Sequence, residues 1–123
     1  MKRIALIGGG ATNLLLASLL SKHQDIKIDI IEIRERVGKK ILETGNGKCN
    51  FTNAQMNHHY FRSNTISNIS AYLDEFGVEE TLQFFDDLHM LYFEKNGYYY
   101  PVSGQASTVL DALRFEIDRN ANQ

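Results

Sequence analysis

The sequence has few of the residues that cross-link or stiffen a small protein: its 123 residues include one cysteine, one proline and no tryptophan. One thiol excludes an internal disulfide, and low cysteine use is typical of proteins from a reducing compartment. The sequence also lacks the roughly 20 consecutive apolar residues that cross a bilayer. Three glycines end the apolar run of residues 4–7, which is too short for a secretion signal. We therefore expect a cytoplasmic protein with no membrane partner.

An excess of charge of one sign is missing as well. The formal net charge is −2, which argues against a general nucleic-acid-binding protein, because that role needs a basic face. A hydrophobic content of 43% with 23% charged residues is ordinary for a folded globular chain. At this length we expect a single domain over residues 1–123 that buries about two thirds of the surface of the unfolded chain.

The N-terminal quarter of the sequence predicts a strand, a glycine turn, a helix and a second strand. Residues 3–7 form a compact apolar run, as expected of a buried parallel strand, and residues 8–10 end it. Residues 11–23 favour a helix, and residues 26–32 favour a strand that ends on an acid. This order is the start of a right-handed βαβ unit. The predicted fold class is α/β, with a small parallel sheet in a Rossmann-like arrangement.

The rest of the chain predicts an irregular loop over residues 50–64, three further helices and a hairpin. Asn96-Gly97 lies between aromatic residues and is typical of a tight hairpin turn. Gly77 is placed to end the first of these helices, and Ser103 is placed to cap the last. The apolar positions that predict the three helices are Ile66, Ile69, Leu73 and Phe76, then Val78, Leu82, Phe85 and Leu88, then Ala106, Val109, Leu110, Leu113 and Ile117.

The end of the sequence leads to one expectation about completeness. In a βα crossover the helix normally leads into another strand, and residues 118–123 do not read as one. Two parallel strands and a hairpin also make a thin sheet for four helices. We therefore expect the chain to be part of a larger dinucleotide-binding domain.

The glycine turn matches two of the three glycines of the dinucleotide-binding fingerprint G-x-G-x-x-G. Gly8 allows the tight turn out of the strand, and Gly10 lets a pyrophosphate approach the helix N-terminus, where free N–H groups and the helix dipole favour anions. The third position holds Asn13, so either the helix stands away from the strand or the Asn13 amide replaces a contact. Glu32, 22 residues after Gly10, is placed to accept hydrogen bonds from ribose hydroxyls. The alternative is a glycine-rich turn beside a solvated acid.

A second glycine-rich stretch, ETGNGKCNFTN at residues 43–53, belongs to a basic part of the chain. Residues 33–48 carry five basic and two acidic residues. The stretch is not a Walker A loop, because Lys48 is followed by cysteine rather than by Ser or Thr. Gly45 and Gly47 free the backbone to expose N–H groups. We interpret the loop as a second clamp that closes over a dinucleotide lying across the first turn.

Cys49 in this loop has several possible roles. A neighbouring cation lowers the pKa of a thiol, so Cys49 beside Lys48 is a candidate reactive residue, although a buried structural cysteine is commoner. With His58 and His59 it lacks the ligand spacing of a structural zinc site, and we predict no metal.

Three segments together resemble the N-terminal part of the BaiN/YhiN-like family of FAD-dependent oxidoreductases. They read IALIGGGATN, IEIRERVGKKILETGNGKCNFTN and YYYPVSGQASTVLDAL. In the same order, the family has a GGGxxG turn after a strand, an E-x(4–6)-G-K-K segment leading to a T/S-G-x-G-[RK]-C-N-x-T-N loop, and an [FY]-P-x-S-x-x-A-x-x-V-x-x-A-L segment. The resemblance covers most of the chain. It implies a two-dinucleotide-binding-type flavoprotein fold with FAD as the cofactor.

The resemblance also implies a set of cofactor-binding residues. They are Gly8, Gly10, Glu32, Lys40, Gly45, Asn46, Gly47, Lys48, Cys49 and Asn50, with Asn13 at the remaining fingerprint position. The family pattern continues into a substrate domain and a returning C-terminal segment, so we expect this chain alone to be catalytically incomplete. No residue stands out as a general acid, a general base or a nucleophile.

The leading hypothesis is the FAD-binding part of a flavin-dependent oxidoreductase with an unknown substrate and NAD(P) as a candidate electron donor. An NAD(P)-dependent Rossmann dehydrogenase is the rival enzyme class, but such a domain needs no second glycine-rich loop. The non-enzyme rival is an inactive fragment that binds nucleotide weakly or not at all. The sequence does not specify the oligomeric state.

Overall fold

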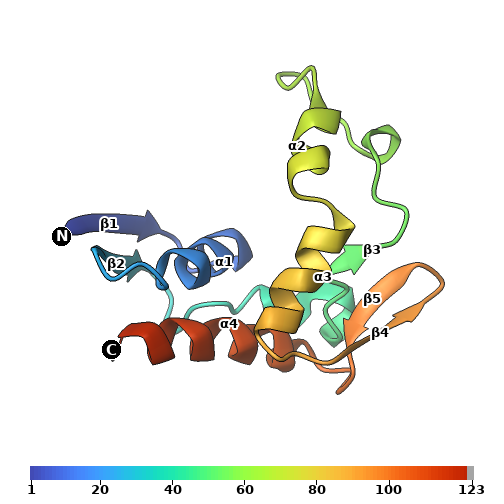
Figure 1. Cartoon of the computed structure of the whole chain (residues 1–123). Helices are drawn as coiled ribbons and strands as arrows, with labels where there is room; N and C mark the ends of the chain where they lie inside the picture. Colours follow the sequence, from blue (N-terminus) through green and yellow to red (C-terminus); the bar gives the residue numbers. More distant parts are fainter. Residues whose placement is uncertain (122–123) are drawn as a thin grey trace.

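The computed structural model describes residues 1–121 and shows an α/β chain with four α-helices along its length (Figure 1). The elements are, in order, β1 (Lys2–Ile7), α1 (Ala11–Leu20), β2 (Ile26–Ile31), the 3₁₀ segment η1 (Ile41–Gly47), β3 (Thr52–Asn53), the 3₁₀ turn η2 (His58–Tyr60), α2 (Ile69–Glu75), α3 (Val78–Asp87), β4 (Tyr92–Lys95), β5 (Tyr98–Pro101) and α4 (Ala106–Ala121).

The predicted βαβ start is confirmed. β1 and β2 pair in parallel from Lys2 opposite Ile26 to Ile7 opposite Ile31, so both strands end at the same edge of the sheet. The first helix is shorter than predicted and ends at Leu20 instead of continuing to residue 23. The Ser21 hydroxyl donates to the Ser18 carbonyl and the chain turns immediately afterwards, which brings it back to the start of β2.

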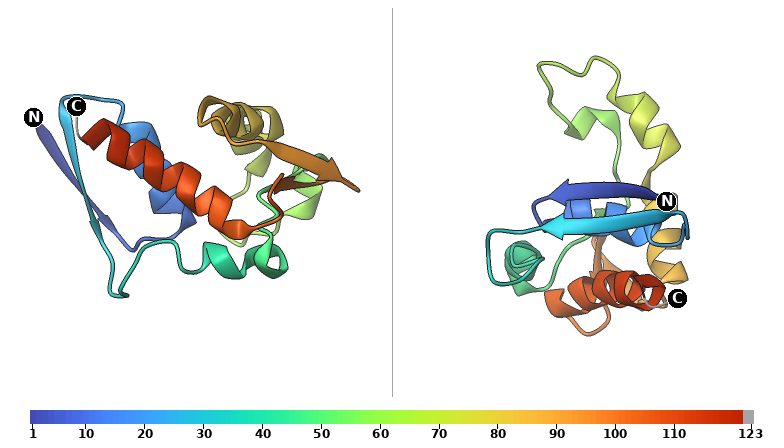
Figure 2. Two further views of the ribbon diagram at one scale, coloured as in Figure 1. Left: turned by 90° about the horizontal axis from the view of Figure 1, so that it is seen from below. Right: turned by 90° about the vertical axis from the view of Figure 1, so that its left-hand side faces the viewer.

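Only one face of the parallel sheet is covered by the described residues. Figure 2 shows α1 and α4 on the same side of β1 and β2. Leu6 is buried, whereas Ile7 and Ile31 at the ends of the strands are 73% and 54% exposed. The predicted parallel strand at residues 3–7 is confirmed, but the prediction that it is buried holds for one of its faces only. A continuous apolar run indicates burial on both faces, and here the second face has no neighbour in the part of the chain described.

The predicted hairpin is confirmed, and a third strand joins it. Asn96 and Gly97 both have positive φ, 54° and 86°, as the tight turn between β4 and β5 requires. Thr52 pairs with Tyr99 in an antiparallel register, so β3 extends the hairpin to three strands. The predicted irregular loop over residues 50–64 thus contains a short strand, which local polarity alone did not indicate.

The two predicted helices of the middle region form as α2 and α3, with a correction at the start of α2. The Asn68 side chain accepts a hydrogen bond from the Ala71 N–H and begins the helix at Ile69, so Ile66 lies outside it and is 47% exposed. Gly77 separates α2 from α3, as predicted. The Glu80 carboxylate accepts a hydrogen bond from the Gly77 N–H at 2.8 Å and thereby caps α3.

The hydrophobic core lies between α1, η1, α3 and α4, with α4 in contact with the largest number of these elements. Val109, Leu110 and Leu113 of α4 are each at most 5% exposed, and the predicted apolar stripe is confirmed. The Ser103 hydroxyl accepts from the Gln105 N–H and so orders the turn before α4, whose first residue is Ala106. Within residues 1–121, no helix combines the length and the apolar character needed to span a bilayer.

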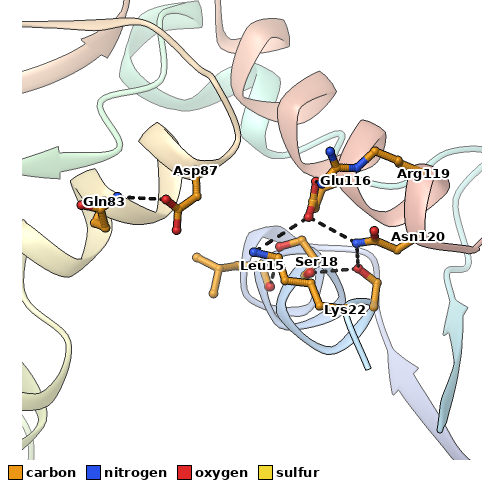
Figure 3. A network of polar contacts seen from close by, with 9 residues as sticks. Leu15, Ser18, Lys22, Gln83, Asp87, Glu116, Arg119 and Asn120 are labelled. Atoms are coloured by element: carbon orange, nitrogen blue, oxygen red, sulfur yellow. Dashed lines mark hydrogen bonds and ion pairs between the residues drawn. The ribbon is translucent and has the colours of Figure 1, made fainter. Parts of the chain in front are cut away.

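A polar network ties the C-terminal part of α4 to the end of α1 (Figure 3). The Glu116 side chain is 7% exposed and pairs with Arg119 at 2.7 Å and with Lys22 at 3.9 Å. Asn120 donates one hydrogen bond to Glu116 at 3.2 Å and another to the Ser21 hydroxyl at 2.9 Å. A buried carboxylate therefore has both cationic and neutral donors around it, as burial of a charge requires.

We expect Glu116→Ala to lower the free energy of unfolding by about 1–2 kcal/mol, because Asn120 and the two cations lose their acceptor. Asp111→Ala is the matched control, since Asp111 is an exposed acid on the same helix. Urea unfolding followed by circular dichroism measures both. Equal losses in the two variants would show that the network does not stabilise the packing of α4 on α1.

Candidate dinucleotide-binding site

The glycine turn lies where the two parallel strands end, and its first glycine has the geometry that the fingerprint requires. Gly8 has φ of +92°, which favours glycine, and its N–H donates to the Ile31 carbonyl at 2.7 Å. Gly10 immediately precedes α1, and a Cβ placed on it would meet no atom within 4 Å among the described residues. The backbone at the start of α1 is thus open to a ligand, and the N–H groups of a first helical turn have no partner within the helix.

Glu32 lies directly beside this turn. One carboxylate oxygen accepts from the Gly9 N–H at 2.7 Å and the other from the Arg34 N–H at 2.9 Å. The Arg34 and Gly9 N–H groups hold the pKa of the Glu32 carboxyl below its ordinary value. Each oxygen keeps a second lone pair, so Glu32 is an oriented, ionised acceptor next to an open helix N-terminus.

The Asn13 amide replaces a contact of the missing third glycine, which is the second of the two possibilities that the sequence left open. Its Nδ2 atom donates to the carbonyls of Ile7 and Gly8 at 2.8 and 2.7 Å. The amide therefore joins the first turn of α1 to the end of β1, in the place where the fingerprint has a glycine for close packing. The side chain therefore supports the turn through two carbonyl groups.

Gly9, the middle glycine, is not among the predicted cofactor residues, yet it is more closely surrounded than Gly8 or Gly10. A Cβ on Gly9 would lie 2.6 Å from Cγ1 of Val37 and 3.1 Å from the Glu32 carboxylate. The fingerprint allows any residue at this position, so the run of three glycines was the only available signal. The contact is between segments far apart in the sequence, and only the folded chain reveals it.

The second glycine-rich loop has an unusual backbone. Four of its residues lie in the left-handed region, namely Gly45, Asn46, Gly47 and Cys49, with φ of 54°, 55°, 82° and 55°. The loop is closed by the Cys49 N–H, which donates to the Thr44 carbonyl at 3.0 Å. A Cβ on Gly45 would lie 2.5 Å from the backbone nitrogen of Asn50, whereas one on Gly47 would meet nothing within 4 Å among the described residues. Gly45 is thus required for closure, and Gly47 is open.

Cys49 and Asn50 anchor this loop to the protein. The Cys49 side chain is 7% exposed within the hydrophobic core, and burial raises the pKa of its thiol. A buried thiol with a raised pKa is a poor nucleophile, so the structural role is favoured over the reactive one. In the orientation that satisfies both ends of its amide, Asn50 donates to the carbonyls of Thr52 at 2.8 Å and Tyr99 at 3.2 Å. These two bonds tie the loop to β3 and β5.

Five positively charged side chains near the two glycine segments form no ion pair within the described residues 1–121. Lys40 and Lys48 are exposed, and so are Arg34, Arg36 and Lys39. Within residues 1–121 the ion pairs use Arg3, Lys22 and Arg119 as their cations and none of these five. The segment from residue 34 to residue 48 therefore presents a positive surface suited to phosphate groups.

The structure brings the two segments to the same end of the molecule without joining them directly. Figure 2 shows η1 on the side toward which β1 and β2 run and on which α1 begins. Leu14 of α1 and Cys49 of the loop belong to the same buried cluster. In the described part of the chain no hydrogen bond or ion pair connects residues 45–50 to the glycine turn. The predicted closure of this loop over a ligand stays a prediction.

Three cavities of the molecule lie away from these residues. One of about 420 Å³ lies between α1 and α3 and another of about 410 Å³ between α3 and α4, and a third of about 380 Å³ is formed by α2, α3 and the chain around η2. None of the three is lined by a predicted cofactor residue. Among residues 1–121, no group of three or more His, Cys, Asp and Glu side chains is placed to hold a metal ion. The candidate site lies at the ends of the parallel strands, where Gly10 is exposed.

We expect Asn13→Ala to lower the free energy of unfolding by about 1–2 kcal/mol, since the carbonyls of Ile7 and Gly8 lose their donor. Thr12→Ala, at the exposed neighbouring position, is the control and should change it by less than about 0.5 kcal/mol. Urea titration of both variants measures the difference. An Asn13→Ala variant as stable as the control would contradict the supporting role of the amide.

The lowered pKa of Glu32 predicts a pH dependence with a defined sign. The folded-state pKa lies below the ordinary value of 4.5, so the charged carboxylate stabilises the fold above that value and the contribution disappears as the pH falls through the lower folded-state pKa. Wild type should therefore be more stable than Glu32→Gln at pH 7, with a difference that shrinks as the pH falls below 4.5. Urea unfolding at a series of pH values tests this, and a difference independent of pH would contradict it.

Comparison with known proteins agrees with this geometry. The sequence model described as the HI0933-like protein Rossmann domain matches residues 2–123. The chain is 40% identical over 120 residues to a 3-dehydro-bile acid delta(4,6)-reductase of Clostridium scindens, covering 97% of this chain and 29% of that protein. It is 26% identical over 115 residues to a ribosomal RNA dihydrouridine synthase of Haemophilus influenzae, covering 93% of this chain and 28% of that protein.

The chain therefore spans less than a third of the length of these curated relatives. Nearly all of its residues fall within the matched region, from the glycine turn through α4. The resemblance inferred from the three sequence motifs is confirmed, and so is the predicted Rossmann-type fold. The chain belongs to the HI0933-like family, whose Rossmann domain it matches over residues 2–123.

Proposed function

We propose that this chain is the FAD-binding part of a flavin-dependent oxidoreductase. The observation that carries the proposal is the arrangement at the ends of β1 and β2. There a helix N-terminus, whose first-turn N–H groups have no partner within the helix, lies beside the oriented and ionised carboxylate of Glu32. This combination suits a ligand that has both a pyrophosphate and a ribose.

The residues present fit such a ligand. The N–H groups at Gly10 and the start of α1 are suited to the pyrophosphate, and the free lone pairs of Glu32 are suited to ribose hydroxyls. Lys40 and Lys48 offset the negative charge of the phosphates. The proposed cofactor-binding set comprises Gly8, Gly10, Asn13, Glu32, Lys40, Gly45, Asn46, Gly47, Lys48, Cys49 and Asn50. Within it, Asn13 and Cys49 hold backbone segments in place and need not touch the ligand.

When bound, a flavin supplies hydride or electron transfer. The part played by this chain is to bind the cofactor, orient it and provide charge near its phosphates. We assign no general acid, general base or nucleophile to the described residues. The names of the two relatives specify different substrates, so the shared region fits a common cofactor better than a common substrate.

Two other functions remain candidates for the test. An NAD(P)-dependent Rossmann dehydrogenase would use the same glycine turn and acid, but it needs no equivalent of the loop at residues 45–50. A fragment that binds nucleotide weakly and has no activity is the non-enzyme alternative.

The single, buried Cys49 fits a reducing compartment, and we propose a cytoplasmic location.

The test is to purify the chain and titrate it with FAD, NADH and NADPH, following flavin or nicotinamide fluorescence and the visible spectrum after desalting. We expect FAD to bind most tightly. Glu32→Ala should raise the Kd for FAD by about tenfold or more, because hydrogen bonds to a carboxylate are lost. Glu35→Ala removes the same charge from an exposed position nearby and should have little effect.

Other outcomes would contradict the proposal in different ways. Tighter binding of a nicotinamide nucleotide than of FAD would favour the dehydrogenase. A folded chain that retains none of the three would favour the inactive fragment. Equal effects of Glu32→Ala and Glu35→Ala would show that FAD binds elsewhere.

A further inference from the structure

The glycine turn is held by one continuous stretch of chain, residues 31–38, which we call the supporting segment. Its first residue, Ile31, accepts a hydrogen bond from the Gly8 N–H at 2.7 Å. Glu32 accepts from the Gly9 N–H at 2.7 Å, and the Gly38 N–H donates to the Gly9 carbonyl at 2.6 Å. Gly9 therefore has both of its backbone polar groups bound to the supporting segment.

The bond to the Gly9 carbonyl also determines the direction of a different N–H group. The carbonyl of Gly9 and the N–H of Gly10 belong to the same peptide unit, which is planar. A donor fixed on the carbonyl thus fixes the orientation of the Gly10 N–H on the opposite side. That N–H lies at the open start of α1, where the backbone is accessible to an anion. Gly38 therefore determines the orientation of the Gly10 N–H, which is the candidate donor to a phosphate, through the planar Gly9–Gly10 peptide.

Gly38 is itself held by α4. It is buried, has φ of +73°, and a Cβ placed on it would lie 2.1 Å from Cδ1 of Leu110. Leu110 is 5% exposed and packs directly on the Gly38 backbone. Val37, the preceding residue, lies against Gly9, as the 2.6 Å approach of its Cγ1 to a Cβ on Gly9 shows. The packing of α4 on Gly38 is thus linked to the glycine turn, because Gly38 and its neighbour Val37 both contact Gly9.

We propose that Gly38 and Leu110 are positioning residues for the pyrophosphate of the bound dinucleotide. Neither touches the ligand. Leu110 fixes the Gly38 backbone, the Gly38 N–H fixes the Gly9–Gly10 peptide, and this peptide presents its N–H to a phosphate oxygen. The proposal rests on the proposed function, because it concerns the same binding site. It assigns a role in cofactor binding to α4, a helix that lies outside the dinucleotide fingerprint.

The test compares two glycine-to-alanine variants with similar backbone strain. Gly38→Ala introduces a side chain at positive φ and against Leu110, whereas Gly104→Ala does so at φ of +66° with nothing within 4 Å among the described residues. Both should lose stability, but Gly38→Ala should raise the Kd for FAD by about tenfold relative to Gly104→Ala. Adding Leu110→Val to Gly38→Ala removes the clashing methyl groups and should restore most of the affinity.

A second readout does not need the cofactor. In ¹H–¹⁵N spectra of the free chain, the Gly10 amide resonance should shift in Gly38→Ala, return toward its wild-type position with Leu110→Val, and remain unchanged in Gly104→Ala. If wild type binds no FAD, the proposed function fails while this measurement still decides whether Gly38 orients the Gly10 peptide. If wild type binds FAD but the folded Gly38→Ala variant has the same Kd as Gly104→Ala, the positioning role is wrong.

If Gly38→Ala does not fold, Val37→Ala replaces it, because it removes the side chain that lies against Gly9. Its expected effect is an increase of about threefold in the Kd for FAD and a shift of the Gly10 amide resonance. Val102→Ala is the control, since Val102 is 56% exposed and lies outside the supporting segment. No difference between these two variants in either measurement would overturn the proposal.

Discussion

The buried face of α4 is the contact on which the rest of the structure depends. Val109, Leu110 and Leu113 form this face, and α4 packs against both α1 and η1. The same buried cluster includes Phe84 and Phe85 of α3. Figure 1 shows α4 running from the hairpin region to the parallel sheet. A helix encoded at the end of the chain therefore holds together elements from its beginning and its middle, because burial of apolar side chains is the main force that favours such packing.

The same contact connects stability with the candidate site. The polar groups of the Gly8 and Gly9 backbone are occupied by partners from β2, from Glu32, from Gly38 and from the Asn13 side chain. These partners hold the turn in one conformation, and the N–H groups at the start of α1 are left for a ligand. Because the anion-binding groups are already oriented, little ordering is required when a dinucleotide binds.

The second segment of the site is built by different means. The loop at residues 45–50 owes its shape to a series of left-handed backbone conformations and to the burial of Cys49 in the core. Its outer surface, with Lys48 and the open Gly47, carries positive charge without a protein partner among the described residues. The helix that follows the glycine turn and the loop at residues 45–50 thus pack on the same buried cluster, through Leu14 and Cys49.

The sequence by itself determined the features that depend on local preference: the βαβ order, the Asn96-Gly97 turn, the buried stripe of α4 and the glycine turn before α1. Periodicity and φ preference act over a few residues, and they can be read without knowing the fold. Tertiary structure alone decided what depends on neighbours distant in the chain. It placed Val37 against Gly9 and Leu110 against Gly38, directed the Asn13 amide to two carbonyls, and buried Cys49. It also left Ile7 exposed, because an apolar run indicates that a strand can be buried but not which of its faces has a neighbour.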